Sequence, residues 1–239
     1  MQLARARITD DPMLARVLTP DAESRLVLAF LIQLSALGRH LSTAHETLIQ
    51  HITPRCRAVG RAKLGRELTT RARREAAYRG MSGEDLEVLV PRWNRHHSPQ
   101  LCIDTLLDAA PTEAMQAYLR VHMRSLEGPL PFALLAMEVE LEHLAAHLGP
   151  ALEDACESAL GPELAGELAI LEGFAPRRGS QSLATLDRLL TEAPELAKDL
   201  ARAGASSLSA FIDILDDCVS RAESIAAYGQ LQAHQPRSA

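Results

Sequence analysis

The sequence contains few aromatic residues, few cysteines and almost no lysine. Phe, Tyr and Trp together make up 3% of the 239 residues, so Leu and Ala must fill the core, which favours helices over strands. All but two of the 25 basic residues are Arg, and we draw no functional prediction from this bias. The cysteines are widely scattered and form no CxxC pair or zinc spacing, which predicts reduced thiols rather than a disulfide framework. They are Cys56, Cys102, Cys156 and Cys218.

Long hydrophobic runs are also missing. The longest, residues 26–34, is interrupted by Gln33 and is far too short to span a bilayer, and the N-terminus lacks the apolar core of a signal peptide. We therefore expect a cytoplasmic protein without a membrane segment. The apolar content of 47% excludes general disorder, and strand-like alternation and internal repeats are not found. The prediction is an all-α, single compact multi-helix bundle over residues 1–229, with a flexible polar tail at 230–239.

Proline, glycine and capping residues predict where the helices begin and end. We expect one helix from Pro20–Asp21 to Leu37, a capping box at Thr43–Glu46, a basic helix from Thr53–Pro54 to Gly80, a helix from Ser82 to Pro91, one from Pro111 to Gly128, one from Pro131 to Pro150, shorter helices ending near Leu171 and spanning 182–190, and a last amphipathic helix over 206–228.

Three spaced patterns resemble the iron-ligand motif Glu-x2-His, Glu, His-x3-Asp-x2-His of the heme-oxygenase-like diiron oxidase superfamily. Further stretches resemble bacterial proteins of the iron-containing redox enzyme type, and the similarity covers about residues 25–225. The resemblance implies a heme-oxygenase-like fold and, in relatives with intact ligands, oxidation of small amino-acid-like or fatty-acid-like substrates by two irons and dioxygen. The patterns here are Glu75-x2-Tyr78, Glu138-x-Glu140 and Phe174-x3-Arg178-x2-Gln181.

Most of the expected ligands are substituted in this chain. Three histidines and one aspartate of the family motif are replaced by Tyr, Phe, Gln and Arg, and Pro176 and Gly179 interrupt the third element at a cost of ~3 kcal/mol for a proline in a helix interior. Imidazole and carboxylate are the donors that iron takes in this superfamily, and Phe and Arg cannot replace them. We therefore expect no diiron centre and no other cofactor.

The helical phase places the first carboxylate, Glu75, on the same stripe as Leu64, Leu68 and Ala72. A carboxylate that faces a core needs a partner. In the superfamily that partner is iron; the alternative is an ion pair, either with Arg71 one turn back on the same helix or with Arg178.

The middle carboxylate is either Glu138 or Glu140, which flank the apolar stripe of their helix from opposite sides. We expect Arg178, or Arg71 if the broken segment lies elsewhere, to occupy the space of the metal, because a guanidinium can bind two carboxylates. Phe174 would fill the remaining volume.

Three functional interpretations follow. The leading one is a metal-site-degenerate superfamily member that acts as a non-catalytic partner or small-molecule-binding protein in a specialised-metabolite pathway, with a protein partner or a second copy of itself as possible partners. The second is a metal-independent enzyme using Glu75, Tyr78 and Glu138 as acids and bases. The third is a regulatory module that uses the Arg-rich segment 55–79, although without a helix-turn-helix pattern nucleic acid is not the expected partner.

Overall fold

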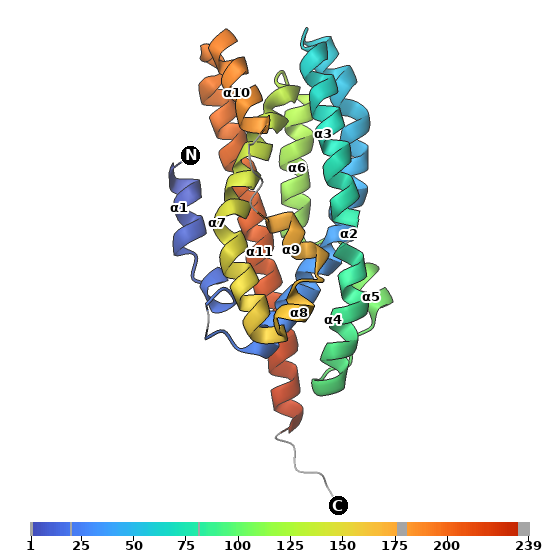
Figure 1. Cartoon of the computed structure of the whole chain (residues 1–239). Coiled ribbons are helices and arrows are strands. Elements are labelled where there is room, and N and C mark those ends of the chain that lie inside the picture. Colours follow the sequence, from blue (N-terminus) through green and yellow to red (C-terminus); the bar gives the residue numbers. More distant parts are fainter. Residues whose placement is uncertain (1, 20, 81, 176–180, 234–239) are drawn as a thin grey trace, which may run out of the picture.

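The chain folds into a bundle of helices, several of which run along a common axis (Figure 1). The computed structural model describes the backbone of residues 2–19, 21–80, 82–175 and 181–233, without the side chains of 2–3, 39, 42–46, 74–83 and 229–233. Within these ranges every regular element is a helix, which confirms the all-α prediction. None of the described helices is both long and apolar enough to cross a bilayer.

The elements follow one another without strands between them in the described part of the chain. They are α1 (Gln2–Asp10), η1 (Leu14–Arg16), α2 (Ser24–Ala58), α3 (Ala62–Gly80), α4 (Ser82–His96), α5 (Ile103–Leu107), α6 (Glu113–Glu127), η2 (Pro131–Ala133), α7 (Leu134–Leu160), α8 (Pro162–Ala165), α9 (Ala169–Phe174), α10 (Gln181–Glu192), η3 (Pro194–Leu196) and α11 (Ala197–Ala233).

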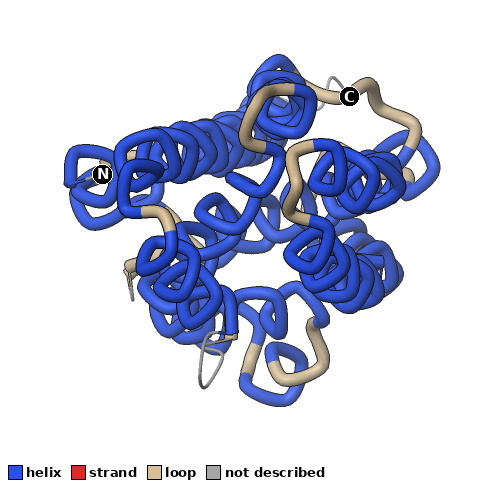
Figure 2. The backbone as a smooth tube through the Cα atoms, turned by 90° about the horizontal axis from the view of Figure 1, so that it is seen from above, coloured by secondary structure: helices blue, strands red, loops and turns tan. Residues whose placement is uncertain are grey.

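The first half of α2 forms the centre of the bundle. Every residue from Leu26 to Gly38 is buried, as expected of a helix that is apolar on all sides. The whole of α2 packs against α3, α4, α6, α7 and α11, and Figure 2 shows the bundle of helices from above. The apolar run that is too short for a membrane therefore serves as the core helix.

Two predicted helix boundaries in the first third of the chain are wrong. α2 continues from Ser24 to Ala58 through Thr43 and Pro54, instead of ending at Leu37 and restarting twice. Pro54 is exposed and lies in the last turns of the helix, where water can reach the backbone carbonyl that loses its partner. The true break is at Gly60, whose φ of 76° suits glycine.

Two further prolines do not end their helices. α4 continues past Pro91 to His96, and α7 continues past Pro150 to Leu160. Both prolines are exposed, and the buried stripe of α7 goes on beyond Pro150 with Leu152, so continued burial outweighs the lost hydrogen bond.

The start of α6 agrees with its cap signal. Thr112 is the N-cap residue, and its Oγ1 accepts a hydrogen bond of 3.2 Å from the backbone N–H of Met115. At the other end of the chain α11 extends from Ala197 to Ala233, longer than the predicted 206–228. Part of the predicted tail is therefore helical, and residues 234–239 lie outside the described part of the chain.

Candidate functional site

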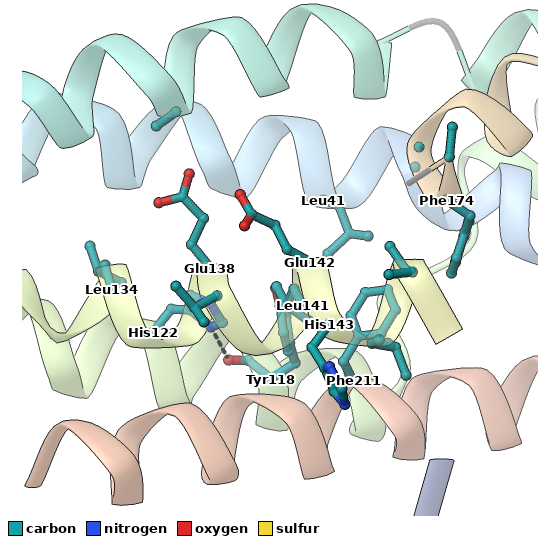
Figure 3. Close-up of a pocket in the computed structure, with 18 of the residues that line it drawn as sticks. Leu41, Tyr118, His122, Leu134, Glu138, Leu141, Glu142, His143, Phe174 and Phe211 are labelled. Carbon is teal, nitrogen blue, oxygen red and sulfur yellow. Dashed lines mark hydrogen bonds between the residues drawn. The ribbon is translucent and has the colours of Figure 1, made fainter. Parts of the chain in front are cut away.

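A cavity of about 540 Å³ lies between α2, α3, α6, α7, α9, α10 and α11. Most of its wall consists of aliphatic and aromatic side chains, with fewer polar groups among them (Figure 3). The volume falls within the range of small-molecule sites, roughly 300–1,000 Å³. Its polar side chains among the described residues are Arg5, Tyr118, His122, Glu138, Glu142 and His143.

Glu138 is one of two carboxylates of α7 that line this cavity, with Glu142. Its Oε2 lies 3.8 Å from Nη1 of Arg71 on α3, and both side chains are largely buried, with 15% and 12% exposed. The predicted pairing of Arg71 with a candidate carboxylate is therefore present, as a long contact rather than a bidentate one. Arg178, the other candidate cation, lies outside the described residues.

Arg71 also connects Glu138 to Glu142 through a serine. Its Nη1 donates a hydrogen bond of 3.1 Å to Oγ of Ser182, the second residue of α10. Ser182 in turn donates one of 2.9 Å to Oε1 of Glu142, one helical turn after Glu138 on α7. Figure 3 shows both carboxylates pointing from α7 toward the ribbons of α2 and α3. The polar network thus links α3, α7 and α10.

Glu140 lies on a different side of α7 and does not line the cavity. Its side chain is 3% exposed, and its two carboxylate oxygens accept hydrogen bonds of 2.8 and 2.7 Å from Nε and Nη2 of Arg5 on α1. These hydrogen bonds raise the pKa of the Arg5 guanidinium. Of the two alternatives for the middle carboxylate, the structure brings Glu138 to the cavity and leaves Glu140 as a structural ion pair.

The two ends of the third motif belong to different helices. Phe174 is the last residue of α9, is buried and lines the cavity, whereas Gln181 is the first residue of α10, is exposed and does not line it. The segment between them that holds Pro176 and Gly179 lies outside the described residues. A single ligand helix through all three motif positions is therefore not formed.

The first motif is only partly described. α3 includes both Glu75 and Tyr78 in its backbone, but their side chains lie outside the description. The stripe predicted to carry Glu75 inward does face inward: Leu64 and Leu68 are buried, and Ala72 lines the cavity. The inward direction of Glu75 stays a prediction.

The described donors do not fit a diiron centre. No group of three or more His, Cys, Asp or Glu side chains in the described part of the chain is arranged to hold a metal ion. Glu138 contacts the Arg71 guanidinium, and Glu142 accepts a hydrogen bond from the Ser182 hydroxyl. Both of these carboxylates at the cavity therefore already have protein partners. We derive no chemistry from iron here.

Tyr118, His122 and Phe211 form an aromatic side of the cavity that the motif comparison missed. His122 is 7% exposed, and its Nδ1 lies 3.1 Å from the backbone carbonyl oxygen of Tyr118. A carbonyl only accepts, so Nδ1 carries the proton. The rings of Tyr118 and Phe211 meet edge to face at 5.5 Å. The spacing of four residues between Tyr118 and His122, in phase with the buried Met115 and Leu126, was the sequence signal for this inward face.

The Arg-rich segment divides into engaged and exposed side chains. Arg55 donates to the carbonyl oxygen of Leu126 near the end of α6, Arg61 pairs with Glu192 at 3.1 Å, and Arg71 pairs with Glu138 at 3.8 Å. Arg66 and Arg73 are exposed. Much of the basic character therefore stabilises contacts between helices.

Comparison with known proteins adds no relative. Protein-family models, curated proteins and solved structures give no significant match to the chain.

Proposed function

We propose that this chain is a small-molecule-binding protein that takes a largely apolar, elongated ligand with a polar head into the cavity. The cavity of about 540 Å³ is the observation that carries the proposal. A packed core leaves few voids larger than a water molecule, so an opening of this size between long helices needs a use. Burial of an alkyl tail stabilises binding by about 0.8 kcal/mol per methylene group.

The head is expected to be a hydrogen-bond donor. At one wall of the cavity Glu138 and Glu142 present two carboxylates, and the Arg71 guanidinium and the Ser182 hydroxyl contact them from outside the lining. The guanidinium already meets Glu138 and Ser182, so an amine or hydroxyl head matches this wall better than a carboxylate. Within this network, Glu138 is the residue that we expect to contact the polar head of the ligand.

We also propose that the chain is related to the heme-oxygenase-like oxidases. An all-helical bundle with a cavity between long helices and a carboxylate on its wall supports it. In that relation the chain keeps a substrate-sized cavity while guanidinium and hydroxyl groups engage the described carboxylates. A role in binding or delivering a small molecule within a biosynthetic pathway follows.

The test uses three ligands that share one tail: decylamine, decanol and decanoate. Each displaces a fluorescent apolar dye from the purified protein, and decylamine and decanol should bind more tightly than decanoate. Equal affinity of all three would contradict the proposed head preference. Absence of binding by all three would contradict the function itself.

Matched variants locate the binding. Ala145 on α7 lines the cavity, whereas Ala151, two turns along the same helix, is half-buried and lines neither this cavity nor the smaller one described below. Ala145→Phe should abolish dye and ligand binding, and Ala151→Phe should retain it. If Ala145→Phe fails to fold by circular dichroism, Ala146→Phe at the exposed rim replaces it. Full binding by a folded variant with a blocked cavity would place the ligand elsewhere.

A second candidate function, acid–base catalysis without metal, is favoured by His122. With Nδ1 donating to the Tyr118 carbonyl, Nε2 is the ring nitrogen that can serve as a base at this cavity. The test follows the exchange of the protons next to the carbonyl of 2-decanone in deuterated water by NMR. Wild type should exchange them faster than His122→Phe; equal rates would remove this candidate.

A further inference from the structure

A second, smaller cavity of about 200 Å³ lies directly behind one wall of the first. Phe174 and Ala175 line both cavities, so the end of α9 is the partition between them. The far walls of the small cavity come from α7 and from the residues around α8 and α9; most lining residues are apolar or glycine, and three are exposed glutamates, Glu153, Glu157 and Glu172.

Phe174 lies far from the polar wall. Glu138 and Gly149 are eleven residues apart on α7, which corresponds to about 16 Å along the helix axis at 1.5 Å per residue. The backbone of Phe174 abuts Gly149, and Figure 3 shows the ring well away from the Glu138 carboxylate. A ligand with its head at Glu138 therefore directs its tail toward Phe174.

The structure holds Phe174 in place at both ends of its short helix. At the start of α9, the carboxylate oxygens of the buried Asp85 accept hydrogen bonds of 2.8 and 2.9 Å from the backbone N–H groups of Ala169 and Ile170. At its end, the carbonyl oxygen of Phe174 approaches Gly149 so closely that a Cβ there would lie 2.2 Å from it. The ring is thus a fixed wall, 9% exposed, rather than a side chain at a free end.

We propose that Phe174 is the end wall that sets the length of ligand the protein accepts, and that the small cavity is a blocked extension of the binding site. This inference rests on the proposed binding function and adds a ligand class to it: straight-chain amphiphiles limited in tail length by one phenyl ring. Removal of the ring opens the large cavity into the small one, so methylene groups that wild type excludes can be buried. Each buried methylene group should then add about fourfold in affinity.

The experiment measures dissociation constants of straight-chain alkanols, from hexanol to tetradecanol, by dye displacement. In wild type, affinity should rise with length and then stop rising at a limit. Phe174→Ala should move that limit to longer alkanols, with an affinity gain of about tenfold or more for the longest ones. Phe174→Leu should move it by less, and it keeps the test valid if Phe174→Ala fails to fold.

Phe211→Ala is the matched control. It removes the same ring from the wall of the large cavity, but Phe211 does not line the small one. It should change affinity at every length and leave the limit where it is. A wild type without any length limit, or a folded Phe174→Leu and Phe174→Ala with the wild-type limit, would overturn the end-wall role. If wild type binds no alkanol at all, the binding function itself fails, which distinguishes the two outcomes.

Discussion

Glu138 and Glu140 are two residues apart on α7, but they differ in burial and in the geometry of their ion pairs. Glu140 is 3% exposed and joined to Arg5 by two hydrogen bonds shorter than 2.9 Å. Glu138 is 15% exposed and meets Arg71 at 3.8 Å beside a cavity. Burial and partner geometry, rather than residue type, therefore separate the Arg5-bound carboxylate of Glu140 from the carboxylate of Glu138 at the cavity.

The largest effect should come from Arg5→Met. It leaves the Glu140 carboxylate buried without its guanidinium, which for a fully buried pair costs roughly 3–5 kcal/mol. Because the Arg5 side chain is 36% exposed, we expect a loss of about 2–3 kcal/mol in the free energy of unfolding, measured in urea.

Glu140→Gln is the control for that variant. It should cost less, about 1–2 kcal/mol, because the half-exposed Arg5 left behind can turn to water. Equal losses for both variants would mean that the buried carboxylate is not the group in need of its partner.

A second test adds volume on the Glu140 side of α7. A Cβ at Gly204 of α11 would lie 2.9 Å from Cγ of Glu140 and 3.0 Å from the carbonyl oxygen of Ala136. Gly204→Ala should therefore destabilise the protein by about 1–2 kcal/mol, despite the better helix propensity of alanine. Gly173→Ala, whose Cβ meets nothing within 4 Å, should be neutral or stabilising in the same urea titration. A stabilised Gly204→Ala would show that the contact between α7 and α11 is loose.

A third carboxylate, Asp216 of α11, pairs with Arg7 of α1 and makes the stability of this side of the bundle depend on pH. Burial, followed by repulsion from Asp11, raises the pKa of Asp216 to about 6, against the attraction of Arg7 and with further repulsion from Asp213. Between the ordinary pKa of an aspartate and about 6, the folded state binds more protons than the unfolded chain, so stability should fall as pH rises through this range.

Asp216→Asn should remove that fall. Because the Asp216 side chain is 26% exposed, the expected difference in pH dependence from wild type is about 1 kcal/mol. Urea unfolding of both proteins at several pH values between about 4 and 7 measures it. An unchanged slope in the variant would assign the pH dependence to other groups.

The smallest effect on stability is expected for Glu138→Gln. Arg71 keeps its hydrogen bond to Ser182, so the loss should be about 0.5 kcal/mol. Decylamine affinity should nevertheless fall about fivefold relative to decanol, because a carboxylate favours an ammonium head. A large stability loss without a change in ligand preference would make Glu138 a structural carboxylate like Glu140.

The sequence allowed the fold class and several inward faces to be predicted, and it misplaced helix ends. Of the stripe that the helical spacing predicts in α11, Leu208, Ile212, Leu215 and Val219 are buried and Phe211 is partly buried. The breaks expected at Pro54, Pro91 and Pro150 are absent because all three prolines lie on the exposed side of long helices. A proline in the sequence indicates that one backbone hydrogen bond of a helix would be lost. It does not indicate whether solvent reaches the freed carbonyl or whether packing outweighs the loss.

Composition and a fixed helical period are enough to predict that the chain is helical and that α7 carries two carboxylates on opposite sides of an apolar stripe. Packing between distant segments places Glu138 at the cavity, pairs Glu140 with Arg5 and brings Phe174 to the cavity lining. No local pattern encodes such contacts, because they join residues far apart in the chain, such as Arg5 and Glu140 at a separation of 135 positions.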